Sequence, residues 1–386
     1  MPWKSASIRF LRFFVLGLSL AGLLALGLLA WEALRTWRQG PILIGFSGQL
    51  SGRYSDLGVQ GRNGAQLAVE HINAAHGVLA RPLRLLAMDD LSTPEGALAA
   101  DKALIDAGVV AIVGHMTSSQ SMAALPLANV TRTVLFSPTT STPLLAGTQD
   151  YFFRNSPVST RAAAFLAEHV RHTLGLGRTA VIYDERNAEF SLAYATAFAE
   201  RFQELAGTVV KRISIEPGGL DAHERTLREL TGHPIEALLI VASARDTASL
   251  AQHAAQLLPH ARFLAADWAC SETLLRHGGR QVEGMLIAVS SLTGERSPNL
   301  EDFQRSFFAR FGVQPTFAAE RAYDAVFILA EALRRCAGTR EGLPEALLTI
   351  QDFQTLSGTL SLDRYGDAES QVSMLRVQNG RFVRID

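Results

Sequence analysis

The chain has 386 residues, which is enough for two domains with complete hydrophobic cores. Its 36 basic and 37 acidic residues are mixed along the chain and leave a formal net charge of -1, so no basic stripe indicates a nucleic-acid partner. Only two cysteines are present, Cys270 and Cys336, and they do not indicate a disulfide framework.

An apolar segment without charged residues lies at residues 13–31, after Lys4, Arg9 and Arg12. Its nineteen residues come close to the roughly 20 that a helix needs to cross a bilayer. The basic residues before it indicate that the rest of the chain lies outside the cytoplasm. We therefore expect residues 1–40 to form a retained inner-membrane anchor with a linker, which places the remainder in the periplasm. A cleaved signal peptide is the alternative.

Short apolar strands alternate with amphipathic helices from residue 41 onward. This order predicts right-handed parallel crossovers and a doubly wound α/β sheet. The elements predicted in this first part are strand 41–47, helix 58–75, strand 82–88, helix 94–106, strand 109–113, a helix that ends at 127, and strand 134–136.

The same alternation restarts after residue 155. Because one sheet of the combined length would be unusual, the restart predicts a second domain. The elements predicted here are helix 160–173, strand 179–183, helix 190–205, strand 208–213, helix 222–230, strand 237–241, helix 246–257, strand 262–265 and strand 285–290. A helix at 318–336 and a closing set of strands and hairpins follow.

Two turns rich in serine and threonine follow neighbouring predicted strands. The first contains Thr117 and Ser118 at the start of a helix, and the second, SPTTSTP, contains Thr139 and Ser141. A helix N-terminus offers unpaired N–H groups, and ligands of open parallel sheets bind outside the carboxyl ends of the strands. The two turns are therefore candidates to hold one small carboxylate. The alternative is that these hydroxyls only cap their own backbone.

Other motifs favour structural roles. Gly58, Gly61 and Gly64 are spaced three apart, which does not match the dinucleotide-binding fingerprint. The adjacent carboxylates Asp89 and Asp90 end a predicted strand, where neighbouring side chains point to opposite faces, so capping or hinge hydrogen bonds are favoured over acid-base catalysis. The sequence contains no nucleophile-elbow motif and no zinc-binding HExxH pair.

Several segments resemble those of periplasmic substrate-binding proteins of the branched-chain amino-acid (leucine/isoleucine/valine) type. They are LSGRYSDLG, GAQLAVEHINAAHGVLARPLRLLAMDD, IVGHMTSSQS, FSPTTSTPLL and AERAYDAVFILAEAL. The resemblance extends over about residues 41–386 and implies two lobes joined by a three-crossing hinge. It places the first lobe at 41–154 plus 290–357 and the second at 155–289 plus 358–386.

The resemblance also implies a function. Such a protein binds a small amino-acid-like ligand between its lobes by hinge closure and delivers it to the membrane subunits of an ABC importer, without a cofactor. The first-lobe residues implied to hold the ligand carboxylate are Thr117, Ser118, Thr139 and Ser141. Asp267 is implied to hold the ammonium group, which needs a carboxylate partner when it is buried. The alternative for Asp267 is an N-cap of the helix near Ser271.

Three further positions are implied by the resemblance to shape the pocket. Leu57 would line the side-chain pocket, and Phe190 would cover it from the second lobe. Phe190 and Ser243 both stand where tyrosine occurs in the family, so the pocket has fewer polar groups. Amides and small carboxylates therefore remain alternative ligands. Trp268 is a candidate to stack on a ligand or a cation, or to pack between the lobes.

Two other functions stay open at this stage. His115, beside the hydroxyls of GHMTSS, is a candidate base for acyl transfer, although the resemblance places a histidine at this position in proteins that only bind. A membrane-anchored sensing module that serves a separate signalling partner is the second alternative, because the same fold occurs in receptors. The non-enzymatic receptor is the interpretation that accounts for the greatest number of residues.

Overall fold

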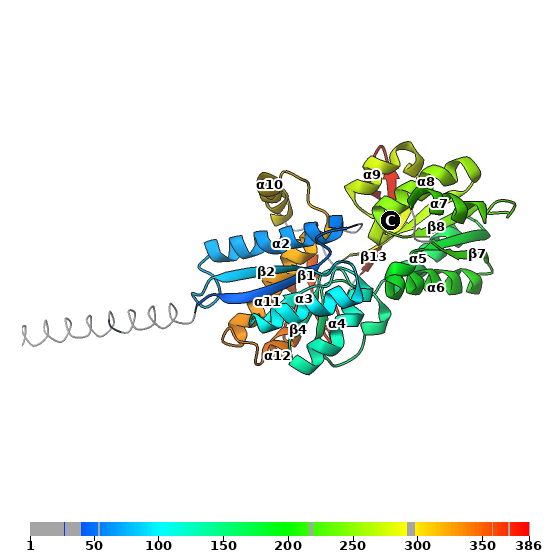
Figure 1. Ribbon diagram of the computed structural model, residues 1–386. Helices are drawn as coiled ribbons and strands as arrows, with labels where there is room; N and C mark the ends of the chain where they lie inside the picture. Colours follow the sequence, from blue (N-terminus) through cyan, green and yellow to red (C-terminus); the bar gives the residue numbers. More distant parts are fainter. Residues whose placement is uncertain are drawn as a thin grey trace, which may run out of the picture.

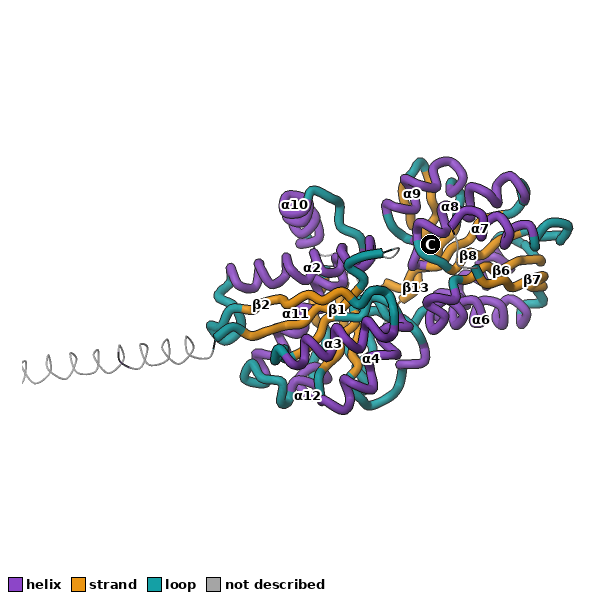
Figure 2. Tube along the Cα trace, in the orientation of Figure 1, coloured by secondary structure: helices purple, strands orange, loops and turns teal. Residues whose placement is uncertain are grey.

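The computed structural model describes residues 40–385, with gaps at residues 53–54, 216–218, 292–297, 357 and 370, and Gly27 alone before residue 40. These residues form two α/β lobes that lie side by side (Figure 1). Each lobe has a central sheet with helices on both faces (Figure 2). The two-lobed fold predicted from the alternating pattern is therefore confirmed.

The sheet of the first lobe has five parallel strands in the order β2-β1-β3-β4-β5. Helices α2 (Ser55–Ala74) and α11 (Phe317–Arg335) cover one face, and α3 (Pro94–Asp106) and α4 (Ser118–Thr131) cover the other. Because all five strands are parallel, their carboxyl ends meet at one edge of the sheet. The strands are β1 (Ile42–Gly48), β2 (Leu83–Asp89), β3 (Ala111–Val113), β4 (Val134–Ser137) and β5 (Phe152–Arg154).

The second lobe has a seven-stranded sheet in the order β14-β13-β10-β9-β8-β6-β7. The strands from β10 to β7 are parallel, whereas β13 runs antiparallel to β10 and to β14. These strands are β6 (Arg178–Tyr183), β7 (Thr208–Ser214), β8 (Ala237–Val241), β9 (Arg262–Ala266), β10 (Leu286–Ser291), β13 (Gln371–Gln378) and β14 (Arg381–Arg384). Its helices are α5 (Thr160–Glu168), α6 (Ala188–Glu204), α7 (Gly219–Arg228), α8 (Ala244–Leu257) and α9 (Glu272–Gly278).

The chain passes between the lobes after β5, after β10 and before β13. Arg154, the last residue of β5, is completely buried, and its Nε donates to Asp367 Oδ1 at 2.7 Å. The backbone N–H of Arg154 also donates to the carbonyl of Gly366 at 3.0 Å. These bonds tie the first crossing to the third, so the two segments form one connection between the lobes.

Helix α2 packs closely against its neighbours through its glycines. A Cβ on Gly58 would lie 1.8 Å from the carbonyl oxygen of Gln49, and one on Gly64 would lie 2.1 Å from that of Ala319. A Cβ on Gly61 would lie 2.5 Å from the terminal methyl carbon of Met116. The three-residue spacing therefore serves the close approach of α2 to the loop after β1 and to α11.

Some elements differ from the predicted ones. Helix α5 ends at Glu168 and continues as a π-helix over His169–Thr173. Helix α10 (Asn299–Phe311) was not predicted, because its buried residues are few and are separated by charged, exposed ones. The short helix α12 (Leu343–Leu348) was not predicted either, because six residues are too few to show a helical period. The hairpin of β11 (Phe353–Thr355) and β12 (Gly358–Leu360) spans the predicted boundary at 357/358, and the exact lobe boundaries stay a prediction.

The predicted anchor at residues 13–31 lies outside the described residues, except for Gly27. Among the residues that the structure describes, no helix combines the length and apolarity needed to span a bilayer. Cys270 and Cys336 are both half-buried and form no disulfide within the described residues.

Candidate ligand-binding site

A cavity lies between the lobes and is lined by residues of both. Seven of the eight predicted site residues line it: Leu57, Thr117, Ser118, Thr139, Ser141, Phe190 and Asp267. The other lining residues are Met116, Asn187, Trp268, Phe317 and Arg321. The carboxyl ends of β3 and β4 thus face the second lobe across the cavity, as expected for an open parallel sheet.

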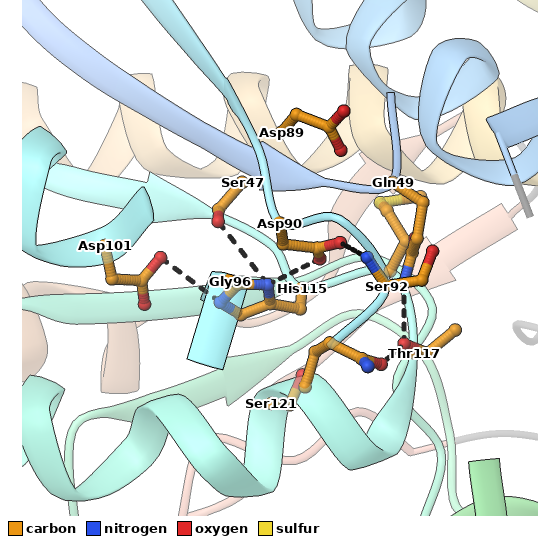
Figure 3. Close-up of polar contacts among 12 residues, drawn as sticks. Ser47, Gln49, Asp89, Asp90, Ser92, Gly96, Asp101, His115, Thr117 and Ser121 are labelled. Atoms are coloured by element: carbon orange, nitrogen blue, oxygen red, sulfur yellow. Dashed lines mark hydrogen bonds and ion pairs between the residues drawn. The ribbon is translucent and has the colours of Figure 1, made fainter. Parts of the chain in front are cut away.

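The two threonine hydroxyls of the first-lobe turns are bonded within the protein. Thr117 Oγ1 accepts from Gln49 Nε2 at 2.8 Å (Figure 3). It also donates to the amide oxygen of Gln120. Thr139 Oγ1 donates to the carbonyl of Met116 at 2.7 Å, which joins the two turns to each other. These threonines therefore hold the shape of the turns.

The two serine hydroxyls are different. Ser118, the first residue of α4, and Ser141 both line the cavity, and their hydroxyls make no hydrogen bond within the described part of the chain. Capping of the second turn falls to its neighbours: Ser137 Oγ accepts from the Thr140 N–H at 2.9 Å, and Thr142 Oγ1 from the Leu144 N–H at 3.2 Å. Some hydroxyls of these turns therefore cap the backbone, whereas those of Ser118 and Ser141 are available to a ligand carboxylate.

Asp267 enters the cavity from the second lobe, directly after β9, as the first residue of a short 3-10 helix (Asp267–Ala269). Burial raises the pKa of its carboxyl group, while the charge of Arg321 and a hydrogen bond from the Trp268 N–H act in the opposite direction. The N-cap position of α9 belongs to Ser271, so the predicted alternative for Asp267 is wrong.

Arg321 is a site residue that the sequence analysis did not single out. It lies in α11, within the segment AERAYDAVFILAEAL, where the helical pattern gave no sign that this position faces the cavity. Its Nη1 donates to Ser156 Oγ and its Nη2 to the Ser290 carbonyl, both at 2.9 Å. Burial lowers the pKa of this guanidinium, and the charge of Asp267 opposes that shift.

Aromatic rings form the apolar wall of the cavity in the second lobe. Phe190 meets Trp268 edge to face, with ring centroids 5.8 Å apart, and packs on Tyr194 at 5.9 Å. Both contacts match the geometry that aromatic pairs prefer. The buried hydroxyl of Tyr194 has no hydrogen-bond partner in the described residues, and burial together with the charge of Asp267 raises its pKa.

Ser243 does not line this cavity. It lies in a larger cleft next to it, which shares Leu57, Trp268 and Phe317 with the cavity. Its hydroxyl accepts from the Asp246 N–H at 3.2 Å and donates to Asp246 Oδ2 at 2.9 Å, so that it caps α8. A contact between Ser243 and a ligand stays a prediction, and such a contact would lie in this larger cleft.

His115 lies behind the first turn and does not reach the cavity. Its Nδ1 lies 2.9 Å from Asp90 Oδ2 and its Nε2 lies 3.2 Å from Asp101 Oδ1, with all three side chains buried (Figure 3). Burial disfavours the charged imidazole, but the two carboxylates outweigh it and raise the pKa of His115 to about 9. This geometry gives His115 a structural role and no access to a substrate.

The two aspartates at the end of β2 both accept hydrogen bonds. Asp89 Oδ1 accepts from the backbone N–H groups of Leu50 and Leu91, each at 3.0 Å. Asp90 Oδ1 accepts from the Ser92 N–H at 2.9 Å, while its other oxygen faces His115. Both carboxylates thus accept backbone hydrogen bonds in the loops beside β2, which agrees with the capping interpretation.

The lobes also touch each other beside the cavity. The Ser119 N–H at the start of α4 donates to Asn187 Oδ1 at 3.2 Å, and the Ser119 hydroxyl donates to the carboxylate of Glu189. Asn187 and Glu189 belong to the second lobe, just before and inside the first turn of α6. One side of the cavity is therefore closed by direct contacts between the lobes.

A profile of the family described as periplasmic binding protein matches residues 41–381. The chain belongs to the periplasmic binding protein family. An amino acid binding protein from Pseudomonas aeruginosa is 24% identical over 361 residues, which cover 90% of this chain and 92% of that relative. The resemblance found in the sequence motifs is confirmed at the level of the family.

Solved structures of periplasmic binding proteins share this fold. A leucine-binding protein from Thermotoga maritima is 26% identical, with a TM-score of 0.81, and the match covers 89% of this chain and 98% of that chain. A branched-chain amino-acid transporter substrate-binding protein from Streptococcus pneumoniae, in complex with isoleucine, has a TM-score of 0.80 at 22% identity, which is a likeness of fold. This match covers 89% of this chain and 100% of that chain.

Proposed function

We propose that this periplasmic binding protein is an extracytoplasmic receptor that binds an α-amino acid between its lobes and presents it to an ABC importer. The observation that carries the proposal is the position of Asp267 across one cavity from the hydroxyls of Ser118 and Ser141. A carboxylate on one wall faces two hydroxyls on the other, Ser118 at the N-terminus of α4 and Ser141 in the turn after β4. This arrangement matches the two charged groups of an amino acid.

Binding would proceed in two stages. The ligand carboxylate first meets Ser118, Ser141 and the start of α4 on the first lobe. The ammonium group gains its partner Asp267 only when the second lobe closes, so the ligand shifts the population toward the closed form by its higher affinity for that form. Phe190 and Trp268 then cover the ligand side chain.

The crossings between the lobes suit such a motion. Arg154 and Asp367 hold two of the connecting segments together, and Ser119 meets Asn187 and Glu189 where the lobes touch. Membrane subunits of an importer would recognise the closed arrangement. The apolar segment at residues 13–31 would keep the receptor at the inner membrane, on its periplasmic side.

A thermal-shift screen of the full chain, purified in mild detergent, tests the proposal. A ligand that binds only the native state at one hundred times its dissociation constant stabilises it by about 2.7 kcal/mol. We expect a shift with at least one α-amino acid and none with the corresponding carboxylic acid that lacks the amino group. Shifts of equal size with both compounds would remove Asp267 from its role, and no shift with any amino acid would contradict the proposal.

A further inference from the structure

Arg321 is the positively charged side chain of the cavity wall. Its guanidinium lies 5.5 Å from the centre of the Phe317 ring, which is a cation-π contact, and Phe317 lines the cavity beside it. One N–H of each terminal nitrogen is taken by Ser156 and Ser290. The remaining N–H groups, including the one on Nε, have no hydrogen-bond acceptor in the described part of the chain.

Arg321 and Asp267 influence each other across the cavity without direct contact. Each charge stabilises the other, as the opposing effects on the two pKa values show. No ion pair within 4.0 Å joins them among the described residues. The cavity therefore presents an anionic and a cationic group that are separated by space, and a ligand with both a donor and an acceptor can contact both.

A ligand that offers only an ammonium and an α-carboxylate uses Asp267, Ser118 and Ser141 and leaves Arg321 without an acceptor. An aliphatic side chain in front of the guanidinium would strip water from its N–H groups and replace none of the hydrogen bonds. A side-chain carboxamide or carboxylate would accept from those same groups. Sites built around a buried donor discriminate strongly against analogues that lack the matching acceptor.

The apolar part of the cavity wall is compatible with a ligand side chain that ends in a carboxamide or a carboxylate. Leu57, Phe190 and Trp268 surround the path between the two charged groups and can pack against the methylene carbons of a polar amino acid. Arg321 is the strongest hydrogen-bond donor among the side chains that line the cavity, because it is the one cationic group among the described residues of that lining.

We infer that the ligand of this receptor is an α-amino acid whose side chain carries a hydrogen-bond acceptor, a carboxamide or a carboxylate, and that Arg321 is the residue that selects it. The inference rests on the proposed function, because it takes the amino-acid site as given. It adds a third polar contact, at the side chain, to the two contacts that every α-amino acid would make.

Arg321 also braces the connections between the lobes through Ser156 and Ser290, which belong to the first and second crossings. A residue that only braced the hinge would affect all ligands to the same extent. A residue that selects the side chain affects ligands according to their acceptor. The test therefore compares amino acids of matched shape, and the result is a ratio of affinities.

The experiment is calorimetric titration of the full chain in mild detergent with L-asparagine, L-aspartate and L-leucine, which branch at the same carbon, and with L-glutamine, L-glutamate and L-methionine. We expect the best ligand with a side-chain acceptor to bind at least tenfold more tightly than its aliphatic counterpart. Arg321→Met should abolish this ratio, and Arg276→Met, an exposed arginine of the neighbouring cleft, should leave it unchanged.

Each outcome decides the inference. Binding of leucine or methionine at least as tightly as their polar counterparts would overturn the selection by Arg321 and leave the proposed function intact. Equal loss for all ligands in Arg321→Met would assign Arg321 to the common α-carboxylate or to the hinge. If Arg321→Met does not fold, Arg321→Lys should still weaken polar ligands severalfold without affecting aliphatic ones. Failure of every α-amino acid to bind the wild type would instead contradict the proposed function.

Discussion

The Nε2 atom of His115 lies 3.2 Å from Asp101 Oδ1 in the interior of the first lobe, where neither side chain is exposed by more than 1%. Asp90 holds the other ring nitrogen, so one imidazole connects the end of β2, helix α3 and the turn after β3 (Figure 3). The carbonyl of His115 accepts from Ser137 Oγ at 2.7 Å, which extends this connection to the second turn. A buried charged cluster thus fixes the backbone that carries Ser118 and Ser141.

His115→Gln should destabilise the protein by roughly 3–5 kcal/mol, because it leaves Asp90 and Asp101 as buried charges without a cation. Urea denaturation measures the change in the free energy of unfolding. The control is His260→Gln, at an exposed position, which should change stability by no more than about 0.5 kcal/mol. Equal effects of the two substitutions would show that the cluster contributes nothing.

The stability of the protein should fall as the pH rises from about 6.5 to about 9. The pKa of His115 is raised from 6.5 to about 9 in the folded state, so the folded protein binds a proton that the unfolded chain releases within this range. The contribution is complete below pH 6.5 and amounts to roughly 3 kcal/mol, which is lost as the pH passes 9. Unfolding free energies at pH 6 and pH 9 measure it, and His115→Gln should lack this component.

The sequence predicted the fold where the pattern is local and continuous. Strand β8 is apolar at every position because helices cover both faces of the sheet. The helices between the strands show a helical period of buried residues. Helix α10 was missed because only Leu300, Phe303 and Phe307 are buried on it. Contacts over long sequence distances, such as Arg154 with Asp367, leave no local pattern.

The residues of the candidate site also differ in whether a local sequence pattern points to them. The turns that contain Ser118 and Ser141 could be named because they follow strands, and the carboxyl ends of strands form the cleft. Asp267 was named from the family resemblance. Arg321 could not be named, since it lies within a helix whose period indicates only which face is buried. The role of His115 was also hidden, because its partners Asp90 and Asp101 come from other elements. Side chains that meet only through tertiary packing need the structure.

Gly64→Ala should destabilise the protein by about 1–3 kcal/mol, although alanine normally favours a helix interior over glycine. The new Cβ would lie 2.1 Å from the carbonyl oxygen of Ala319 and would force α2 and α11 apart. Gly177→Ala, in the loop before β6, is the control for added bulk, because the nearest atom to its Cβ would be 3.7 Å away. Thermal denaturation compares them, and a stabilised Gly64→Ala would contradict the close packing of α2.

Ser118→Ala and Thr117→Val should affect different properties. The Ser118 hydroxyl has no partner in the described residues, so its loss should leave stability within about 0.5 kcal/mol and weaken amino-acid binding about tenfold. Thr117→Val removes the partner of the buried Gln49 and Gln120 amides and should cost about 1–3 kcal/mol of stability. Unfolding and titration experiments on both variants separate the two roles.

The pairing of Asp267 with a ligand ammonium is the contact on which the receptor account depends most. Calorimetric titration of the wild type and of Asp267→Asn with the amino acid found in the thermal screen measures it directly. The account predicts saturable binding of one ligand per chain in the wild type and a loss of at least a hundredfold in affinity, which corresponds to about 2.7 kcal/mol, in Asp267→Asn. Equal affinity of the two proteins for that amino acid would contradict it.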